Sequence, residues 1–375
     1  MKLTCLQENL NFGLQATGHL VNKNINLPIL NNVLLEAKQD GLKLSSTNLE
    51  IGISCQVRCK VDVEGAFTVD AKLISEYVNL LPNDQVNISL DKDDFLSVLC
   101  RQSQTKIKGI QADDFPVIPQ IERNEAYKVK TADFKKALNQ VVFAVAPSET
   151  RPEISGVLMS FNKNNEKKLF LVGTDSYRLT EKKLAFEGSD KEQDVIVPVK
   201  TLQEVLRIIS GLKDQSNPVE EMQIYLSENQ ILFVCGGVEL ISRLIEGQYP
   251  DYKQIIPKES KTKVKASVSE LIKAIKTVAL FSKNGIFDIR LLFDAGTGLN
   301  LRAANNQVGE SASTVEVEFI GETNENTLNY RYLLDGLNSI EGDEVEITVV
   351  DNAVPCLIRP AGKDDYLYLV MPIRQ

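Results

Sequence analysis

The segment LKLSSTN at residues 42–48 returns as LFLVGTD at residues 169–175 and as LNLRAAN at residues 299–305. The three segments share the pattern Leu-x-Leu-x-x-(Thr/Ala)-(Asn/Asp), and successive copies are 127 and 130 residues apart. Alternating leucines followed by a small polar residue are typical of a β-strand that ends in a turn. Self-similarity at a nearly fixed period indicates tandem copies of one structural unit. The pattern therefore predicts a chain built from three similar domains.

Other features keep the same order around each copy of this segment. A short basic and apolar strand (residues 2–4, 128–130 and 263–265) precedes an amphipathic helix (7–22, 131–146 and 268–282). A second helix (71–81, 200–212 and 331–340) precedes an acidic turn and an alternating strand (86–90, 222–226 and 345–349). Apolar residues recur at helical spacing in the helices and alternate in the strands.

The predicted fold class is therefore α+β, with two helices covering one face of an antiparallel sheet in each domain. The aromatic-proline pairs Phe115-Pro116 and Tyr249-Pro250 close the first two copies. We expect domains at residues 1–124, 125–258 and 259–375, each near the usual domain size. Three unrelated α+β domains are the alternative.

Composition excludes several classes of protein. Of the 375 residues, 43% are hydrophobic and 25% charged, and no apolar stretch approaches the roughly 20 residues that a membrane span needs. The N-terminal residues lack the pattern of a secretory signal. We expect a cytoplasmic protein with no membrane partner.

No enzyme signature stands out. The sequence has no nucleophile-base pair, no phosphate-binding glycine loop and no second Cys or His pair to complete a metal site with Cys55 and Cys59. These two cysteines are expected on one strand face as buried free thiols. The single histidine, His19, is expected at a helix end in a capping or surface role. We therefore predict no catalytic residues, no cofactor and no metal.

The net charge of -9 argues against nucleic acid at first sight. The six predicted helices nevertheless carry eight basic and six acidic residues, so the acidity lies in the strands and loops. Such a protein can present a mildly positive helical face, although ordinary solvation of helices would give the same count.

Four segments carry a resemblance to a known family: LPILNN (27–32), GTDSYRL (173–179), GQYPDY (247–252) and YLVMPIR (368–374). In combination they resemble the bacterial DNA polymerase III beta sliding clamp, and the resemblance extends from end to end. It implies a processivity factor that is not an enzyme, a head-to-tail homodimer whose six domains close a ring, and helices that line the hole. The implied partners are double-stranded DNA bound without sequence preference, a clamp loader, and polymerases and repair proteins that bind through short linear motifs.

The resemblance also implies a partner-peptide cleft between the second and third domains. Apolar walls would take the peptide's Leu and Phe anchors, and Arg178, Asn329 and Arg374 would satisfy its polar groups. Gln254 stands where some relatives have Arg, and Ser176 where some have Gly. The matching positions are Ile154, Thr174, Tyr177, Arg178, Leu179, Pro250, Gln254, Ile255, Asn329, Tyr332, Ala353, Pro355, Leu369, Val370, Met371, Pro372, Ile373 and Arg374.

Two further sets of residues are predicted. The subunit contact is expected to join an edge strand around Lys106, Ile107 and Lys108 to the helix end at Leu280 and Phe281. The expected DNA-facing residues are Lys23, Asn24, Lys72, Lys135, Lys136, Lys200, Arg207, Lys273, Lys276 and Arg331.

Two competing functions stay open from the sequence. A monomeric adaptor could use the same cleft without encircling DNA, and quaternary structure would separate the two. An enzyme would require a convergent group of perturbed carboxylates in a deep pocket.

Overall fold

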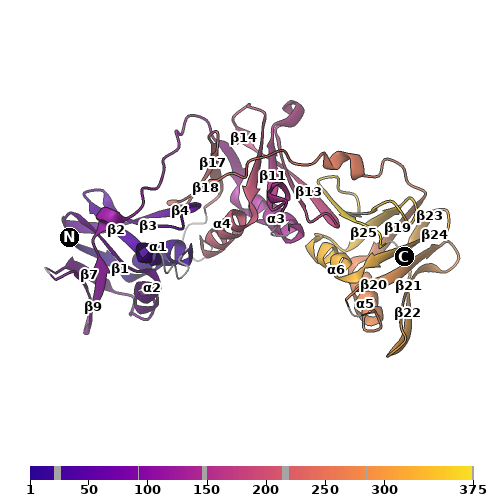
Figure 1. The fold of residues 1–375 in the computed structure, drawn as a ribbon, viewed down its shortest axis with the longest axis horizontal. Helices are drawn as coiled ribbons and strands as arrows, with labels where there is room; N and C mark the ends of the chain where they lie inside the picture. The colour runs from indigo at the N-terminus through magenta and orange to yellow at the C-terminus, as the bar shows by residue number, and fades with distance from the viewer. Residues whose placement is uncertain (21–26, 92, 146–149, 213–218, 284, 374–375) are drawn as a thin grey trace. The chain divides into compact units, whose positions relative to one another are not determined.

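The computed structural model describes residues 1–20, 27–91, 93–145, 150–212, 219–283 and 285–373 (Figure 1). The chain forms two compact units. The first consists of Met1–Ala132, Glu187–Ser189 and Lys200–Leu244, and the second of Asp133–Phe186, Asp190–Val199 and Ile245–Gln375. The first unit holds a 14-stranded sheet, and the second holds a nine-stranded and a four-stranded sheet. In the described part of the chain, no helix is long and apolar enough to cross a membrane.

The same order of helices and strands occurs three times. The first copy contains β1 (Lys2–Leu6), α1 (Gln7–Thr17), β2 (Asn32–Lys38), β3 (Gly41–Thr47), β4 (Ile51–Val57), β5 (Cys59–Val63), β6 (Gly65–Asp70), α2 (Ala71–Asn79), β7 (Gln85–Leu90), β8 (Phe95–Cys100) and β9 (Ser103–Ile110). The second contains β10 (Tyr127–Lys130), α3 (Thr131–Val141), β11 (Gly156–Phe161), β12 (Lys168–Thr174), β13 (Arg178–Ala185), β14 (Glu187–Gly188), β15 (Gln193–Pro198), α4 (Val199–Gly211), β16 (Glu221–Leu226), β17 (Gln230–Cys235) and β18 (Val238–Arg243). The third contains β19 (Thr262–Ser267), α5 (Val268–Ala279), β20 (Asp288–Asp294), β21 (Gly298–Asn305), β22 (Gly309–Val315), β23 (Glu318–Gly321), β24 (Asn324–Asn329), α6 (Tyr330–Ser339), β25 (Glu344–Val349), β26 (Cys356–Pro360) and β27 (Tyr366–Val370). The predicted triplication is confirmed.

The first helix of each copy ends earlier than predicted. Helix α1 ends at Thr17 because Gly18 follows it and the chain tightens into the 3-10 turn η1 (Gly18–Leu20). Helix α3 likewise passes into η4 (Val142–Ala144), and α5 ends at Ala279. Residues 21, 22 and 146 of the predicted helices lie outside the described residues.

Each copy builds its sheet in two halves. A four-stranded half has the order β4-β3-β2-β6, β13-β12-β11-β15 or β22-β21-β20-β24, and a five-stranded half has the order β9-β8-β7-β1-β5, β18-β17-β16-β10-β14 or β27-β26-β25-β19-β23. The signature segment is the second strand of every four-stranded half. The leucines at the first and third positions of this segment are buried in all three copies, which is why the Leu-x-Leu pattern recurs.

The copies join through strand pairing. Strand β18 of the second copy pairs antiparallel with β4 of the first, and both belong to the first unit. Strand β27 of the third copy pairs antiparallel with β13 of the second, and both belong to the second unit. The sheets therefore continue across both junctions of the chain.

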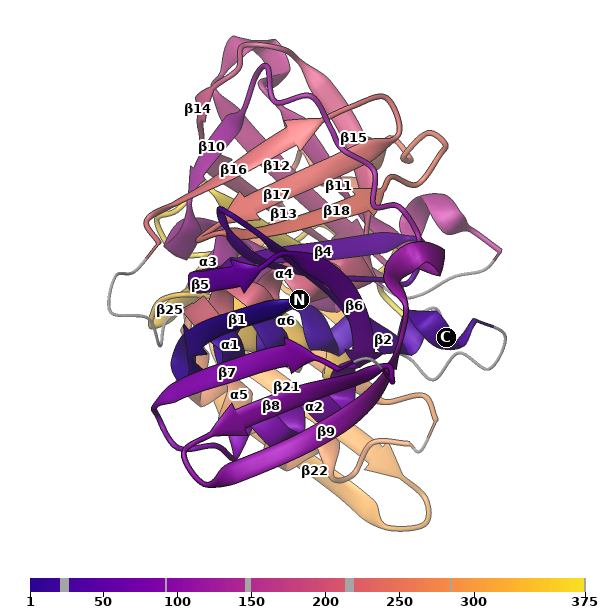
Figure 2. The same cartoon turned by 90° about the vertical axis from the view of Figure 1, so that its left-hand side faces the viewer.

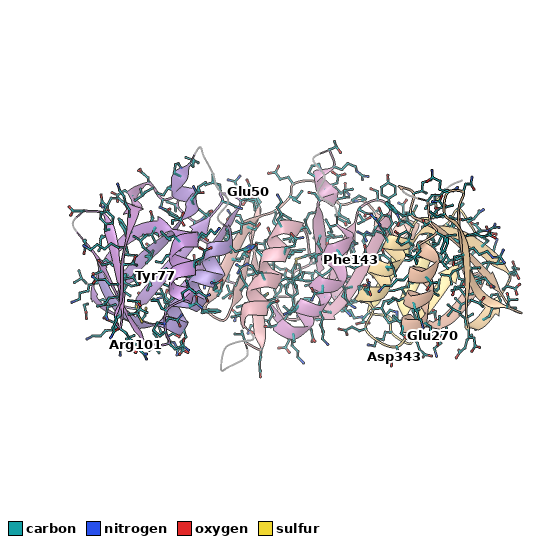
Figure 3. The ribbon with its side chains drawn as sticks, turned by 90° about the horizontal axis from the view of Figure 1, so that it is seen from below. Glu50, Tyr77, Arg101, Phe143, Glu270 and Asp343 are labelled. Atoms are coloured by element: carbon teal, nitrogen blue, oxygen red, sulfur yellow. The ribbon has the colours of Figure 1, made fainter. Side chains whose placement is uncertain are left out.

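The helices pack on the sheets by their apolar faces. In the first unit α1 contacts β3, β4 and α2, and in the second unit α5 contacts β20, β21, β22 and α6. Ser267 caps α5, and Glu270, labelled in Figure 3, lies in the first turn of this helix. The Val268 N–H donates to the Asp343 carbonyl at 2.9 Å. Asp70 caps α2 and Asn329 caps α6 in the same way, so the sequence encodes these helix starts locally.

The six cysteines are free thiols, and five of them are buried. The expectation that Cys55 and Cys59 share one strand face is wrong, because β4 ends at Val57 and a new strand, β5, begins at Cys59. Cys59 lies opposite Cys5 of β1, whereas Cys55 lies opposite Leu44 of β3.

His19 has the surface role that was predicted, with a specific partner. Its side chain is 63% exposed, and Nδ1 lies 2.7 Å from Oε1 of Glu204. Arg207 donates to the same carboxylate at 2.8 Å and to the carbonyls of Gln15 and Ala16 at 2.8 and 2.7 Å. These carbonyls lie at the C-terminal end of α1, where backbone acceptors lack helical partners. The three side chains thus link the first two copies.

Candidate functional site

A pocket of about 150 Å³ opens on the second unit, beside the pairing of β13 with β27. Its walls come from the turn between β12 and β13, the segment that includes η8 (Tyr252–Ile255), and the end of β27. Most of its exposed wall is apolar. The lining residues are Arg151, Ile154, Thr174, Ser176, Arg178, Leu179, Tyr249, Pro250, Asp251, Tyr252, Ile255, Leu369 and Met371.

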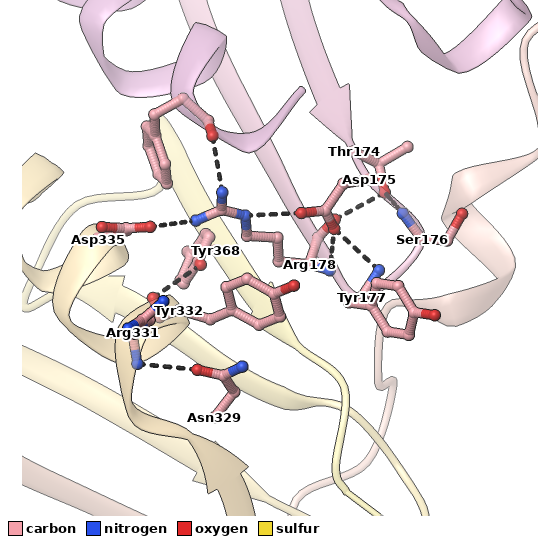
Figure 4. Close-up of polar contacts among 11 residues, drawn as sticks. Thr174, Asp175, Ser176, Tyr177, Arg178, Asn329, Arg331, Tyr332, Asp335 and Tyr368 are labelled. Carbon is pink, nitrogen blue, oxygen red and sulfur yellow. Dashed lines mark hydrogen bonds and ion pairs between the residues drawn. The ribbon is translucent and has the colours of Figure 1, made fainter. Parts of the chain in front are cut away.

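The turn at the pocket rim is fixed by side-chain to backbone hydrogen bonds. Asp175 Oδ1 accepts from the N–H groups of Tyr177 and Arg178 at 2.9 and 3.0 Å, and Thr174 Oγ1 donates to the Arg178 carbonyl at 2.6 Å (Figure 4). Ser176 has a φ of 77°, in the left-handed region that favours glycine. This backbone conformation explains why a glycine also suits this position.

Arg178 connects the turn to the third copy. Nε donates to Asp175 Oδ2 at 3.0 Å, Nη1 to Asp335 Oδ2 at 2.5 Å, and Nη2 to the Phe143 carbonyl at 2.9 Å (Figure 4). The guanidinium also lies over the ring of Tyr332, 4.6 Å from its centroid, and 5.3 Å from that of Phe143. One side chain, 12% exposed, therefore joins β13, η4 and α6.

Electrostatics keep this arginine charged. Burial by itself would lower the pKa of Arg178, but neighbouring groups, among them the carboxylates of Asp335 and Asp175, outweigh burial and raise it. Burial raises the pKa of the Tyr368 hydroxyl, which stays protonated and donates to the Tyr332 carbonyl at 2.8 Å. The charges in this wall of the pocket are thus compensated by their neighbours.

Two residues of the pocket lining, Leu179 and Leu369, belong to an apolar cluster. The cluster consists of Leu158, Val172, Leu179, Leu357, Leu367 and Leu369. Tyr249 and Tyr252 pack against it, and their hydroxyls donate to the Val172 carbonyl at 3.2 Å and to Glu181 Oε2 at 2.6 Å. Burial raises the pKa of both tyrosines, and for Tyr252 the Glu181 carboxylate adds to the effect. Both hydroxyls therefore already have acceptors within the fold, and the surface offered to a ligand is mainly apolar.

The C-terminal segment forms one edge of the pocket. Met371 lines it, and the Met371 N–H donates to the Tyr177 carbonyl at 2.9 Å. Two residues further on, the Ile373 N–H donates to the Thr327 carbonyl at 2.8 Å. These two bonds hold the segment against both the second and the third copy.

Eight predicted cleft residues line this pocket: Ile154, Thr174, Arg178, Leu179, Pro250, Ile255, Leu369 and Met371. The others lie around it or support it. Asn329 caps α6, Tyr332 stacks on Arg178, Gln254 donates to Asp251 at 3.0 Å, and Tyr177 is 63% exposed at the rim. Pro355 and Val370 are buried, Pro372 and Ile373 are half-buried, and Ala353 is exposed. Arg374 lies outside the described residues.

Five residues of the lining are absent from the predicted cleft positions: Arg151, Ser176, Tyr249, Asp251 and Tyr252. Four of them belong to the quoted segments 173–179 and 247–252. These segments were recognised, but only single matching positions within them were predicted as cleft residues. Arg151 carried no such signal. It enters the lining because its Nη1 donates to Ser176 Oγ at 3.2 Å.

The predicted DNA-facing residues have different surroundings. Lys200, Lys273, Lys276, Lys72 and Arg331 are exposed on their helices, Lys135 is half-buried, and Arg331 also stacks on Phe287, 3.6 Å from the ring centroid. Lys136 lies 3.6 Å from Glu341, and Arg207 is engaged by Glu204 and the α1 carbonyls. Lys23 and Asn24 lie outside the described residues.

The predicted subunit-contact residues lie on two separate units. Lys106, Ile107 and Lys108 belong to β9, where Ile107 is buried and Lys106 lies 2.7 Å from Asp91. Leu280, 77% exposed, and the half-buried Phe281 follow α5.

Comparison with known sequences decides the family. The DNA polymerase III beta subunit matches this chain over residues 1–119 for its N-terminal domain, 128–251 for its central domain and 253–374 for its C-terminal domain. The chain belongs to the DNA polymerase III beta subunit family. The beta sliding clamp of Synechococcus elongatus is 32% identical, covering 100% of this chain and 99% of the relative. That of Staphylococcus aureus is 29% identical over 93% of this chain and 92% of its own length.

Solved structures of beta subunits have the same fold. The sliding clamp of Bacillus subtilis superimposes with a TM-score of 0.92 at 27% identity, covering 100% of this chain and 99% of the other. The clamp of Pseudomonas aeruginosa bound to griselimycin gives 0.92 at 28% identity and full coverage of both chains. The function of the chain is accordingly that of a DNA sliding clamp, a processivity factor of DNA replication. The domain boundaries at 124 and 258 stay a prediction.

Proposed function

We propose that two copies of this chain close head to tail into a ring around duplex DNA, and that the pocket on the second unit binds linear peptides of polymerases and repair proteins. The ring is proposed because, among the described residues, two complementary strand edges of the chain stay unpaired. Each junction inside the chain pairs the last strand of a five-stranded half with the last strand of a four-stranded half. Three copies in a row form two such junctions, so one five-stranded half and one four-stranded half each keep an unpaired last strand.

The two remaining edges are β9 and β22. Strand β9 pairs with β8 along its length and with β6 at Gly109 and Ile110 (Figure 2). Strand β22 pairs with β21. Within the described residues, neither strand has the partner that β18 and β27 find in β4 and β13. A long unpaired strand edge is a template for another chain.

Pairing β9 of one copy with β22 of another repeats the junction already used twice. The contact joins different surfaces, so it is heterologous and must either close or propagate. Two chains of three similar domains close the ring after six domains, as the family resemblance implies. The exposed Leu280 next to α5 then gains a neighbour at the seam.

Duplex DNA is the proposed occupant of the ring. The six α-helices among the described residues retain eight basic and six acidic residues, although the whole chain carries -9. A weakly positive lining supports sequence-independent contact with phosphates and does not hold DNA tightly. Topological linkage provides the retention, and a clamp loader would open the ring.

The pocket is proposed as the docking site for partner peptides. Its apolar lining, which includes Leu179 and Leu369, can take Leu or Phe anchors, and its rim offers Arg151, Asp251 and backbone groups for polar contacts. The ordered tyrosine hydroxyls and the Arg178 network make it largely preformed, which lowers the cost of binding. We propose a binding role without catalysis or cofactor, and a cytoplasmic location.

Retention on DNA tests the ring. Protein loaded by a clamp-loader ATPase onto nicked circular DNA should remain bound through gel filtration at high salt. Linearising the same DNA should release it, because only the topology has changed. Equal retention on circular and linear DNA would contradict encirclement, and a matched sample without loader gives the background.

A further inference from the structure

Two cysteines of the first copy face each other across neighbouring strands. Cys5 of β1 lies directly opposite Cys59 of β5, and the register of the two strands is regular from Leu3 to Cys5 (Figure 2). The other four cysteines, all of them among the described residues, face residues of other types: Cys55, Cys100, Cys235 and Cys356 lie opposite Leu44, Ser103, Val238 and Val370. Strand pairing therefore brings together this one pair of thiols among the six.

Backbone hydrogen bonds on the other side of β1 show which kind of pair this is. At the start of β1, the Leu90 N–H donates to the Met1 carbonyl at 3.0 Å. Just after β1, the Gln7 N–H donates to the Asp84 carbonyl at 2.9 Å. Bonding alternates along an antiparallel strand, so the odd-numbered residues of β1 bond to β7. The backbone N–H and C=O of Cys5 therefore point to β7, away from β5.

Cys5 and Cys59 thus form a non-hydrogen-bonded pair, which is the position that suits a disulfide. Residues paired in this way have Cα atoms about 4.5 Å apart, and their side chains stand on the same face of the sheet. A disulfide requires a Cα separation of roughly 4.4–6.8 Å. The backbone spacing of this pair therefore already allows the bond.

The two thiols differ in their access to solvent. Cys5 is 4% exposed, whereas Cys59 is half-buried. Strand β5 is the last strand of its sheet, and within the described residues it pairs only with β1. A reagent from solvent therefore reaches Cys59 first, and Cys5 is placed to react with whatever Cys59 has bound.

The electrostatics of the pair make this reaction faster at alkaline pH. Burial raises the pKa of Cys5 to about 12, and the neighbouring Cys59 adds to the rise. Burial also raises the pKa of Cys59, although the Leu42 backbone acts in the opposite direction. The thiolate is the form that reacts, so both thiols are inert for most of the time at neutral pH.

We propose that Cys5 and Cys59 form a dithiol site, which small disulfides such as oxidised glutathione convert into an intrachain disulfide between β1 and β5. The Cys59 thiolate attacks one sulfur of oxidised glutathione and releases one glutathione thiolate. Cys5 then loses its proton and attacks the Cys59 sulfur of the mixed disulfide, which releases the second glutathione. Two protein thiols thereby lose two electrons and two protons, and one glutathione disulfide becomes two thiols.

The bond ties the last strand of the sheet to its neighbour. It closes the loop that runs from Cys5 to Cys59 and so restricts the unfolded chain. The oxidised protein should therefore unfold at a temperature about 5–10 °C higher than the reduced protein. A thiol reductant reverses the reaction, so the state of the pair follows the redox conditions. The site lies within the first copy and does not depend on the proposed ring.

Peptide mapping of the full chain tests the site. Reduced wild type is incubated with oxidised glutathione at mildly alkaline pH, blocked with N-ethylmaleimide and digested with trypsin without reductant. Arg58 lies between Cys55 and Cys59, so trypsin separates these two cysteines. We expect the peptides of Cys5 and Cys59 joined, two hydrogen atoms lighter than their sum, and separated again by dithiothreitol. Thermal unfolding of the oxidised and reduced samples gives the shift in Tm.

Two variants serve as controls. Cys59→Ala removes the more accessible thiol and should abolish both the linked peptides and the rise in Tm. Cys55→Ala removes a buried thiol of the preceding strand and should leave both unchanged. Unfolding of the reduced variants reports whether each one folds, and the wild-type map decides the question if one does not.

Three results for the wild type would overturn the proposal. Glutathione could remain on Cys59 while Cys5 is recovered as a free thiol. A link from Cys5 to Cys55 would assign the pair to the wrong strand. Recovery of Cys5 and Cys59 as unmodified thiols, under conditions in which urea-unfolded protein is oxidised, would show that the folded pair does not react.

Discussion

Arg178 Nη1 lies 2.5 Å from Asp335 Oδ2, and this contact joins β13 of the second copy to α6 of the third (Figure 4). The two carboxylates on Arg178 differ in environment: the Asp175 side chain is 9% exposed, and that of Asp335 is 48% exposed. The arginine therefore both neutralises a buried charge at the pocket rim and ties the rim to the third copy.

Replacing this arginine should loosen the pocket. Arg178→Met leaves Asp175 buried without its counter-charge, which should cost about 3–5 kcal/mol. Asp335→Asn removes a half-exposed partner and should cost about 0.5–1 kcal/mol. Calorimetric unfolding gives the order of stabilities, and fluorescence polarisation with a polymerase-derived peptide gives affinity. Equal effects of the two variants would contradict the assigned role of Asp175.

Removing the C-terminal segment should abolish peptide binding. Deletion of residues 371–375 takes Met371 from the pocket wall and breaks its bond to the Tyr177 carbonyl. The dimer should persist, because the proposed seam uses β9 and β22. Fluorescence polarisation and sedimentation measure the two properties on one sample, and Met371→Ala serves as the milder variant. Undiminished peptide affinity would show that the pocket is not the docking site.

Gly336 should tolerate no side chain. A Cβ there would lie 2.2 Å from Cε1 of Tyr368, whose ring is fully buried beneath α6. Gly336→Ala should therefore destabilise the protein by about 1–3 kcal/mol through overpacking. Gly211 at the end of α4 has no atom within 4 Å of its Cβ position. Gly211→Ala is the matched control and should be neutral or slightly stabilising in thermal unfolding, because alanine favours helix.

The cysteines predict a loss of stability at alkaline pH. Burial raises the pKa of Cys55 and Cys356 to about 12, and that of Cys5 likewise with a smaller contribution from Cys59. Above the ordinary thiol pKa, the unfolded chain loses these protons while the folded chain keeps them. Stability should therefore fall as pH rises from about 9 to 12.

Native thiol labelling checks the same assignment. At pH 8, iodoacetamide should modify Cys59 first, because it alone among the cysteines is not buried. Peptide mass mapping locates the label, and urea-unfolded protein shows that all six can react. Faster labelling of Cys356 than of Cys59 would contradict the placement of β26 in the core.

The sequence predicted the parts of this fold that local pattern encodes. The repeated Leu-x-Leu segment forms the expected strand in each copy, and the helices predicted to begin at residues 71, 131 and 268 begin there. The quoted segments 173–179 and 247–252 contribute residues to the pocket lining. Helix ends were predicted too late, because a 3-10 turn satisfies the last carbonyls without changing the apolar pattern. The strand break at Arg58 also left no mark in the alternation of residues 51–59.

Contacts between distant segments were beyond the sequence. The charge count treated Arg207 as a free helical cation, but it binds Glu204 and the carbonyls of α1. Arg178 was expected to bind a polar group of the peptide. In the structure its guanidinium already donates to Asp175, to Asp335 and to the Phe143 carbonyl. Such pairings depend on which strands meet at a junction, and residue spacing carries no information on that.

Closure of the ring through β9 and β22 can be tested by a single proline. At the internal junctions Gln56 donates to the Gly237 carbonyl and Lys183 to that of Asp365, so alternate residues of β4 and β13 bond across. By the same alternation, the Ala312 N–H of β22 points to the open edge of this strand. Ala312→Pro should therefore remove one hydrogen bond across the seam and leave the pairing of β22 with β21.

Sedimentation velocity of the wild type and Ala312→Pro measures the outcome directly. The wild type should sediment at about twice the chain mass of 41.7 kDa, and Ala312→Pro as a folded single chain that still binds peptide. A wild type at the mass of one chain, or an Ala312→Pro variant that remains as stable a dimer as the wild type, would contradict the ring.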